Sequence, residues 1–296
     1  MAHEILPIPP ASPGEVGIMG VRHVLIVATK NSFLPHPWYY FHAYVNTYLS
    51  EYLRQLPLTL GERVIVEAAC VGNGVFADKC DVVSSVGNRD GVILSDGRFL
   101  YVLGNVSALV VPDTESYSAV LGTSSAVGQL KGIKVADSSV IKKDFAFLED
   151  AGRTMPVIVP ANVEIGLISD QTHLDHLSFL EAQFLGEELA TDSQKFYKKK
   201  ERIPRTHPVI LKRNGEAIGM VKSDFFSERS AMVSMLFIAT EHRGRGYGQL
   251  LLQWYIHFLL ERSGSICLFY SKTNAAAKEL YRKVGFQKNE EWTMML

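Results

Sequence analysis

Residues 231–260 read AMVSMLFIATEHRGRGYGQLLLQWYIHFLL, and this stretch decides the fold of the C-terminal part of the chain. It opens with nearly continuous apolar residues, Ala231 to Ala239, which predict a central strand covered on both faces. A glycine-rich segment follows, and from Gln249 to Glu261 leucines and aromatic residues recur at three- and four-residue spacing. That spacing predicts a helix with one face held against a sheet.

The segment between this strand and this helix is suited to binding an anion. Free backbone N–H groups converge at a helix N-terminus, and the helix dipole adds partial positive charge there. Gly246 and Gly248 permit close approach of a ligand, while Arg243 and Arg245 can neutralise a pyrophosphate. A glycine-rich turn that binds nothing is the alternative interpretation of glycines before a helix.

The elements around this stretch follow from alternation, apolar spacing and turn residues. Arg213-Asn214-Gly215 predicts a tight hairpin between two strands. The expected elements of the C-terminal part are a strand at Val163–Ile168, a helix at Asp170–Gly186, strands at Pro208–Lys212, Ala217–Val221 and Ile266–Tyr270, and a last strand at Gln287–Leu296.

A second motif lies downstream of the turn. Residues 274–286 read NAAAKELYRKVGF, which matches N-x-x-A-x-x-L-Y-x-x-x-G-F, and Arg243, Gly246 and Gly248 fill the fixed positions of R/Q-x-x-G-x-G/A. Both patterns belong to the GNAT N-acetyltransferase superfamily, and residues 160–296 resemble that family in the order of their elements as well. The resemblance implies an α+β fold with a mixed central sheet flanked by helices.

The resemblance also implies acetyl-coenzyme A as cosubstrate, without a metal, and a set of binding residues. The central strand is expected to splay from the next one, so that its backbone binds the pantetheine arm. The side chain of Asn274 is expected to contact the arm, which is compatible with a role as helix N-cap. The residues implied in coenzyme binding are Leu236, Phe237, Ile238, Arg243, Gly244, Arg245, Gly246, Tyr247, Gly248, Gln249 and Asn274.

Tyr281 is the position that the resemblance assigns to protonation of the leaving thiolate. A phenol suits this step because its pKa lies near that of a thiol. Packing of the ring on the helix face beside Leu280 is the alternative. No covalent intermediate is needed, so Cys267, on a predicted strand, is expected to be a small core residue.

The proton acceptor for the attacking amine is the point where the sequence departs from many relatives. Neither Ala231–Ile238 nor Ser265–Asn274 contains Asp or Glu. Deprotonation is expected to use a water relay through Ser234, or a group elsewhere, for which Glu228, Asp224 and His207 are the nearest candidates in sequence. A substrate amine that is already partly neutral is the other explanation.

The N-terminal part has no such motif. Residues 1–17 are expected to form an irregular lead-in and residues 18–155 an α/β domain, with a junction at Gly152–Asn162. That domain is either a noncatalytic GNAT-like partner or an unrelated α+β domain. Its expected elements are a helix at Pro37–Leu56, strands at Val24–Val27, Arg63–Ala69, Gly91–Leu94, Phe99–Leu103 and Ala108–Val111, a hairpin at Asp96-Gly97, and helical character around Lys142–Phe145.

The composition is that of an ordinary globular protein. Thirty Lys and Arg balance 31 Asp and Glu among 296 residues, which argues against nucleic acid or an anionic membrane as partner. The N-terminus lacks the pattern of a secretory signal, so a cytoplasmic location is expected, as a monomer or homodimer. Cys70, Cys80 and Cys267 have neither disulfide nor metal-ligand spacing.

The function that the sequence predicts is acetyl-coenzyme A-dependent N-acetylation, with direct transfer to a primary amine of a small molecule or a protein. Two alternatives stay open. One is a coenzyme A-binding regulatory protein without catalysis, and the other is transfer of a longer acyl group.

Overall fold

The computed structural model describes residues 53, 55–71, 81–84, 90–95, 99–107, 109, 119–130, 140–149, 157–168, 171–189 and 207–295. We refer to the described residues up to 149 as the N-terminal half and to those from 157 onward as the C-terminal half. The expected lead-in 1–17, the strand at Val24–Val27 and nearly all of the helix at Pro37–Leu56 lie outside the described residues. No helix in the described ranges is long and apolar enough to cross a membrane.

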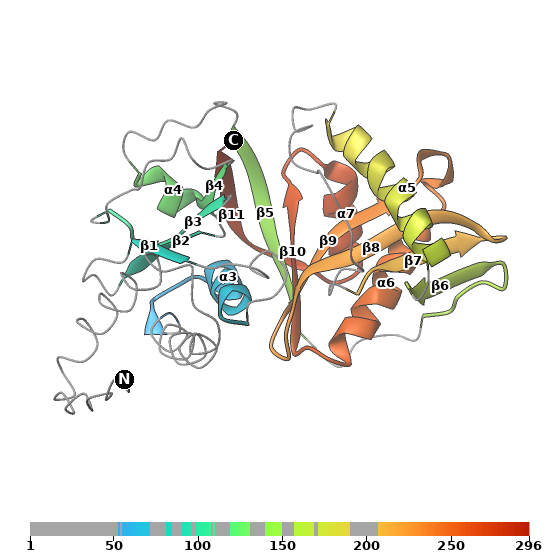
Figure 1. Ribbon diagram of the computed structural model, residues 1–296, viewed down its shortest axis with the longest axis horizontal. Coiled ribbons are helices and arrows are strands. Elements are labelled where there is room, and N and C mark those ends of the chain that lie inside the picture. The colour runs from blue at the N-terminus through green and yellow to red at the C-terminus, as the bar shows by residue number, and fades with distance from the viewer. Residues whose placement is uncertain are drawn as a thin grey trace, which may run out of the picture.

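One mixed sheet runs through both halves (Figure 1). Its strand order is β1-β2-β3-β4-β11-β5-β10-β9-β8-β7-β6. The strands are β1 Asp81–Ser84, β2 Gly91–Ser95, β3 Phe99–Gly104, β4 Ala119–Thr123, β5 Val140–Glu149, β6 Val163–Leu167, β7 Val209–Arg213, β8 Glu216–Phe226, β9 Ala231–Ile238, β10 Ser265–Ser271 and β11 Gln287–Met295. The helices are α3 Leu60–Val71, α4 Ser124–Gly128, α5 Gln171–Leu189, α6 Tyr247–Leu260 and α7 Ala275–Lys283, and η3 Thr240–His242 is a 3-10 helix.

The two halves exchange their last strands at the centre of the sheet (Figure 1). Strand β5, the last strand of the N-terminal half, pairs with β10 of the C-terminal half, and β11, the last strand of the C-terminal half, pairs with β4. The two exchanged strands also pair with each other. Each half therefore depends on the other to complete its sheet, and the expected α+β fold with a mixed sheet is confirmed.

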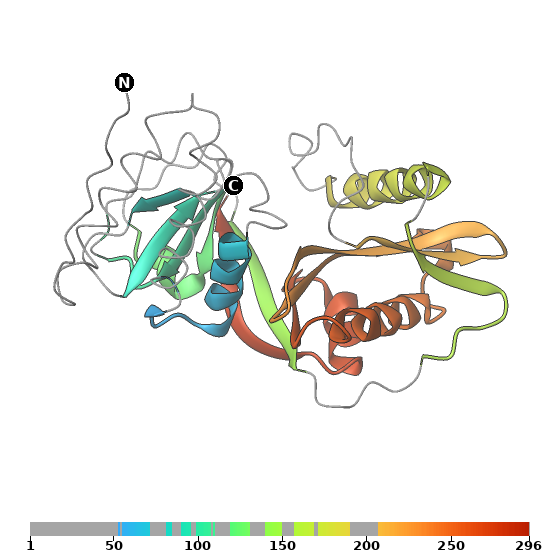
Figure 2. The ribbon, with the colours of Figure 1, turned by 60° about the horizontal axis from the view of Figure 1, so that its bottom comes forward.

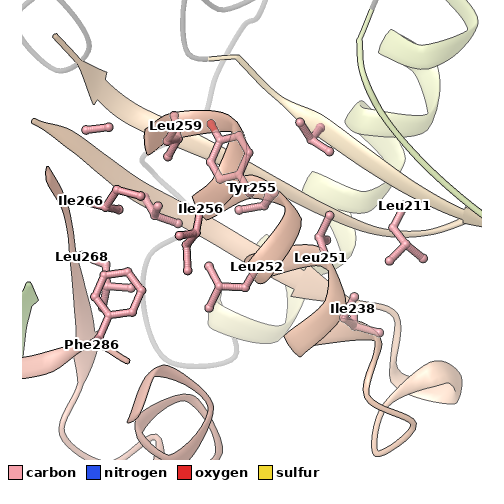
Figure 3. Packing of buried hydrophobic residues seen from close by; sticks show 14 of the residues in the cluster. Leu211, Ile238, Leu251, Leu252, Tyr255, Ile256, Leu259, Ile266, Leu268 and Phe286 are labelled. Carbon is pink, nitrogen blue, oxygen red and sulfur yellow. The ribbon is translucent and has the colours of Figure 1, made fainter. Parts of the chain in front are cut away.

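The C-terminal half follows the predicted order of elements. Asn214 and Gly215 both have positive φ, 51° and 82°, as the predicted Asn-Gly hairpin between β7 and β8 requires. Helix α5 covers one face of this part of the sheet, and α6 and α7 cover the other (Figure 2). Figure 3 shows Leu251, Leu252 and Tyr255 of α6 packing on apolar side chains of the strands, which fixes the start of α6 beside the end of β9.

The prediction of a strand at Arg63–Ala69 is wrong, because these residues lie in helix α3. The run Val64-Ile65-Val66 favours a strand by side-chain shape, but a capping box starts a helix just before it. The Thr59 N–H donates to Glu62 Oε2 at 2.9 Å, and the Glu62 N–H donates to Thr59 Oγ1 at 3.4 Å. Val64, Ile65 and Ala68 are buried in an apolar cluster with residues of β2, β3 and β5, so tertiary packing stabilises the helix.

The helical character expected around Lys142–Phe145 is also wrong, because these residues lie in strand β5. The segment pairs with a strand on each side, since Lys143 and Asp144 lie opposite residues of both β10 and β11. The pairing is nonlocal, and local spacing carries no signal for it. By contrast, β2 and β3 pair antiparallel as the Asp96-Gly97 signal predicts. The predicted strand at Ala108–Val111 lies outside the described residues except for Leu109, which is not in a strand.

A buried carboxylate stabilises the N-terminal half. Glu62 is 1% exposed, and its Oε1 accepts hydrogen bonds from the Gly104 N–H at 2.9 Å and from the Thr123 hydroxyl at 3.1 Å. It thus joins α3 to the ends of β3 and β4.

We expect Glu62→Ala to lower the free energy of unfolding by about 3 kcal/mol, because two buried donors and the α3 cap lose their acceptor. Urea denaturation measures the change. Glu216→Ala, which removes an exposed carboxylate, is the control and should change stability by less than about 0.5 kcal/mol. Equal stability of the two variants would contradict the role of Glu62.

Candidate active site

Strands β9 and β10 separate partway along their length. They pair in parallel only where Ala231, Met232 and Val233 face residues 266–268, although β9 continues to Ile238 and β10 to Ser271. In the described residues, the part of β9 beyond Val233 is therefore not paired with β10, which agrees with the expected splay. Ser234, Met235 and Leu236 are half-buried, whereas the rest of β9 is buried.

A bulge in β9 lies at this separation. Between the pairs Lys222–Ser234 and Met220–Phe237, two residues of β9 oppose one residue of β8. Met235 has φ 31°, a left-handed conformation that a residue with a side chain rarely adopts. Bulges take backbone N–H groups out of the ladder and turn side chains in new directions. Such strain at the mouth of a splay is typical of a functional site.

The glycine-rich turn follows the separated end of β9 and leads into α6. Gly244 and Gly246 have φ values of 72° and 83°, and a Cβ placed at either would meet no atom within 4 Å. Gly246 is the N-cap of α6 and offers no side-chain acceptor. The N–H groups of Tyr247, Gly248 and Gln249, in the first turn, therefore have no acceptor from within the helix. The turn therefore has free space above Gly244 and Gly246, both in the left-handed conformation, and presents backbone N–H donors.

The two arginines of the turn lie differently. Arg243 Nε donates to the Ile238 carbonyl at 2.8 Å, and its guanidinium carbon lies 5.3 Å from the centre of the Phe237 ring. Arg243 thus ties the turn to the end of β9. Arg245 is exposed on the turn. Arg243 can hold the turn in shape, while Arg245 can supply charge to an anion.

Helix α7 brings the second motif to the same place. A Cβ at Gly248 would lie 3.7 Å from both Ile238 Cγ1 and Leu280 Cδ2, so β9, α6 and α7 meet there. Asn274 is the N-cap of α7, with its Oδ1 accepting the Ala277 N–H at 2.9 Å, and it is exposed. The turn and Asn274 thus stand at the starts of neighbouring helices.

Tyr281 lies on the inner side of α7. Its ring centre is 5.4 Å from that of Tyr270 on β10 and 5.9 Å from that of Phe286. Tyr281 is half-buried, whereas Tyr270 and Phe286 are buried. The expected packing of the ring and an accessible hydroxyl are therefore compatible. Gly285 has φ 103°, as expected at the end of α7.

Ser234 meets one of the carboxylates that the sequence offers. The Ser234 hydroxyl lies 2.8 Å from Asp224 Oδ1 and 3.3 Å from the Lys222 carbonyl. Asp224 is the extra residue of a second irregularity, between Ser223 and Phe225 of β8, which turns it toward Ser234. Lys222, opposite Ser234, makes an ion pair of 3.2 Å with Glu181 on α5, so this polar group lies on the α5 face.

The other two candidates lie elsewhere. Glu228 is in the turn between β8 and β9, where its carbonyl accepts the Gly264 N–H at 2.9 Å, at the opposite end of β9 from the splay. His207 packs against Phe226 and Phe258, near the end of α6. Burial, and then the charge of Arg262, lower the pKa of His207. Cys267 is fully buried, and burial raises its thiol pKa, in keeping with a core residue.

One charged group that the sequence did not reveal lies beside Tyr270. Asp144 on β5 is 3% exposed and lies opposite Tyr270 in the register, and burial and then the charge of Asp144 raise the pKa of the Tyr270 phenol. No local signal could have found Asp144, because only the exchange of strands brings it to the C-terminal half.

A mixed sheet with this order of strands, opened beside a helix N-terminus, defines the GNAT fold class. Comparison with family models agrees, because residues 174–286 match the Acetyltransferase (GNAT) family. Residues 174–286 are therefore a GNAT domain. Comparison of the sequence with curated proteins gives no significant match.

Two solved structures share the fold over most of the chain. A Drosophila protein is 13% identical with a TM-score of 0.54, and the match covers 94% of this chain and 96% of that one. A GCN5-related N-acetyltransferase-like protein from Streptococcus suis is 14% identical with a TM-score of 0.52, covering 83% of this chain and 98% of that one. At these identities the likeness shows the fold alone.

Proposed function

We propose that the protein is an N-acetyltransferase that moves an acetyl group from acetyl-coenzyme A directly to a primary amine of a small molecule or a protein. The observation that carries the proposal is the separation of β9 from β10 directly beside the open turn at Gly244–Gly246. A pantetheine arm needs the gap between the two strands, and a pyrophosphate needs the open turn at the helix N-terminus.

The bulge supports an electrostatic role for β9. Backbone N–H groups near Met235 and Leu236, released from the ladder, polarise the thioester carbonyl. The amine nitrogen forms the new C–N bond, and the C–S bond breaks. Tyr281 gives its phenolic proton to the leaving sulfur. The proton that the nitrogen loses as the amide forms restores the phenol through water.

Asp224 is the proposed proton acceptor, and it acts through Ser234. The protonated amine gives one proton to the Ser234 oxygen as Ser234 passes its own proton to Asp224, 2.8 Å away. The neutral amine then attacks. This pair supports the proposal better than Glu228 or His207 does, because only Ser234 lies at the bulge.

We expect Asp224→Asn to lower kcat about 100-fold near neutral pH, because general base catalysis of this kind contributes about that much. Ser234→Ala should lower it similarly, with little change in KM for acetyl-coenzyme A. Thiol release from coenzyme A measures both. Glu228→Gln is the matched change at the competing carboxylate. A large loss in Glu228→Gln together with full activity in Asp224→Asn would overturn the assignment.

The same assay separates the proposal from its alternatives. Thiol release with a panel of primary amines should exceed hydrolysis for at least one of them. Coenzyme binding without any turnover would instead favour a regulatory protein. Calorimetry with acetyl-, propionyl- and longer acyl-coenzyme A should show no gain in affinity with chain length, and a steady gain would favour a longer acyl group.

We also propose two domains, residues 18–155 and 160–296, the first a noncatalytic GNAT-like partner. Strands β3 and β4 run parallel, as β9 and β10 do, but stay paired from Phe99 to Val102. A Cβ at Gly122 would lie 2.4 Å from the Val102 carbonyl, so the two strands are in close contact where β9 and β10 part. The proposed location is the cytoplasm.

A further inference from the structure

Asp144 is a buried charge that the proposed mechanism has not used. It lies directly opposite Tyr270 in the pairing of β5 with β10 and is 3% exposed. Ala146, two residues on, packs in the apolar cluster under α6, so Asp144 faces α6 and α7 as well. The negative charge of Asp144 is close enough to raise the pKa of the Tyr270 phenol. The N-terminal half thus places a carboxylate next to the ring on which Tyr281 packs.

Charges on the second exchanged strand surround this carboxylate. Lys288 of β11 lies 2.8 Å from Asp144 Oδ1. Glu291, opposite Asp144 in the register, forms an ion pair with Lys272, just after β10, and lies 3.6 Å from Lys142 of β5. The Lys288 side chain is 47% exposed, and ion pairs open to water contribute little to stability, so this pairing does not account for a carboxylate buried beside Tyr270.

The contact between Tyr270 and Tyr281 links the carboxylate to the reaction. Tyr270 is 8% exposed, and the two ring centres are 5.4 Å apart. Burial first, and then Asp144, raise the pKa of Tyr270, so its phenol stays protonated and is able to donate to Asp144. A phenol that donates to Asp144 would fix the surface against which Tyr281 rests.

We propose that Asp144, supplied by the N-terminal half, accepts a hydrogen bond from the Tyr270 phenol and is thereby a positioning residue of the acyl-transfer site, which orients Tyr281 through Tyr270. The inference rests on the proposed function. If Asp144 has this role, the strand exchange makes the N-terminal half part of the catalytic unit. The C-terminal half binds the substrates, and the N-terminal half fixes the geometry of the proton donor Tyr281.

The test is a double-mutant cycle in the full-length protein. Asp144→Asn should lower kcat about tenfold through misplacement of Tyr281, with KM for acetyl-coenzyme A within about twofold. In the Tyr281→Phe background the same change should have no further effect. Glu149→Gln, the same chemical change at the exposed end of β5, should leave kcat unaltered. Tyr270→Phe breaks the same hydrogen bond and should behave as Asp144→Asn does, which keeps the test valid if Asp144→Asn does not fold.

The outcomes separate the two claims. Independent losses that multiply in the double variant would overturn the positioning role while leaving the proposed function intact. Absence of turnover in the wild type would contradict the proposed function, and the inference with it. A readout apart from activity tests the contact itself. In a near-ultraviolet pH titration, subtracting the absorbance of Tyr270→Phe from that of the wild type isolates the ionisation of the Tyr270 phenol. The same subtraction in the Asp144→Asn background should place this ionisation at lower pH. An unmoved titration would refute the hydrogen bond.

Discussion

Gly246→Asp is expected to abolish binding of acetyl-coenzyme A. Gly246 caps α6 with φ 83° in open space, so an Asp side chain there would extend toward the place proposed for pyrophosphate. At about 4 Å and an effective dielectric constant of about 20, the carboxylate and a phosphate repel by about 4 kcal/mol, which corresponds to a loss of about 1000-fold in affinity. Isothermal calorimetry with acetyl-coenzyme A measures the loss.

Gly215→Asp is the matched control for this variant. Gly215 has φ 82° and equally open surroundings, but it lies in the hairpin between β7 and β8. The control therefore carries the same backbone strain and the same added charge outside the turn. Its affinity should stay within a few-fold of wild type. If Gly246→Asp also binds as wild type does, the turn has been wrongly assigned.

Tyr281→Phe is expected to lower kcat about 100-fold while leaving the affinity for acetyl-coenzyme A nearly unchanged, because only the proton donor is lost. The phenyl ring keeps its contacts with Tyr270 and Phe286, so the fold should be unaffected. Thiol release under saturating acetyl-coenzyme A gives kcat, and calorimetry gives the affinity.

Tyr101→Phe removes a hydroxyl from a buried ring in the N-terminal half and serves as the control. Wild-type kcat is expected for it. A wild-type rate for Tyr281→Phe too would mean that Tyr281 is a packing ring only, and that solvent protonates the thiolate.

The sequence predicted the C-terminal half well because its signals are local. Apolar spacing predicted α6, and the Asn214-Gly215 pair predicted the hairpin between β7 and β8. Two short motifs marked the starts of α6 and α7. The N-terminal errors have a common cause. Side-chain shape favoured a strand at Val64–Val66, but a capping box and burial made a helix. The local sequence around Lys142 favoured a helix, but strand partners far along the chain decided otherwise.

The candidate site divides in the same way. The turn was visible in the sequence because its glycines and arginines are consecutive. Ser234 and Asp224 were both named, but their contact depends on two bulges, which alternation does not reveal. Asp144 was out of reach, because its place next to Tyr270 is set by the exchange of strands.

The exchange of strands has a consequence for how this protein is made. On the ribosome, β4 and β5 emerge well before β11, which is synthesised after every other strand of the sheet. Until then β4 has an unpaired edge, and such edges promote association between nascent chains. Closure of the sheet is therefore a late, long-range event, and such contacts form slowly. Truncations that remove β11 should harm the distant N-terminal half, and chaperone dependence should end when β11 docks.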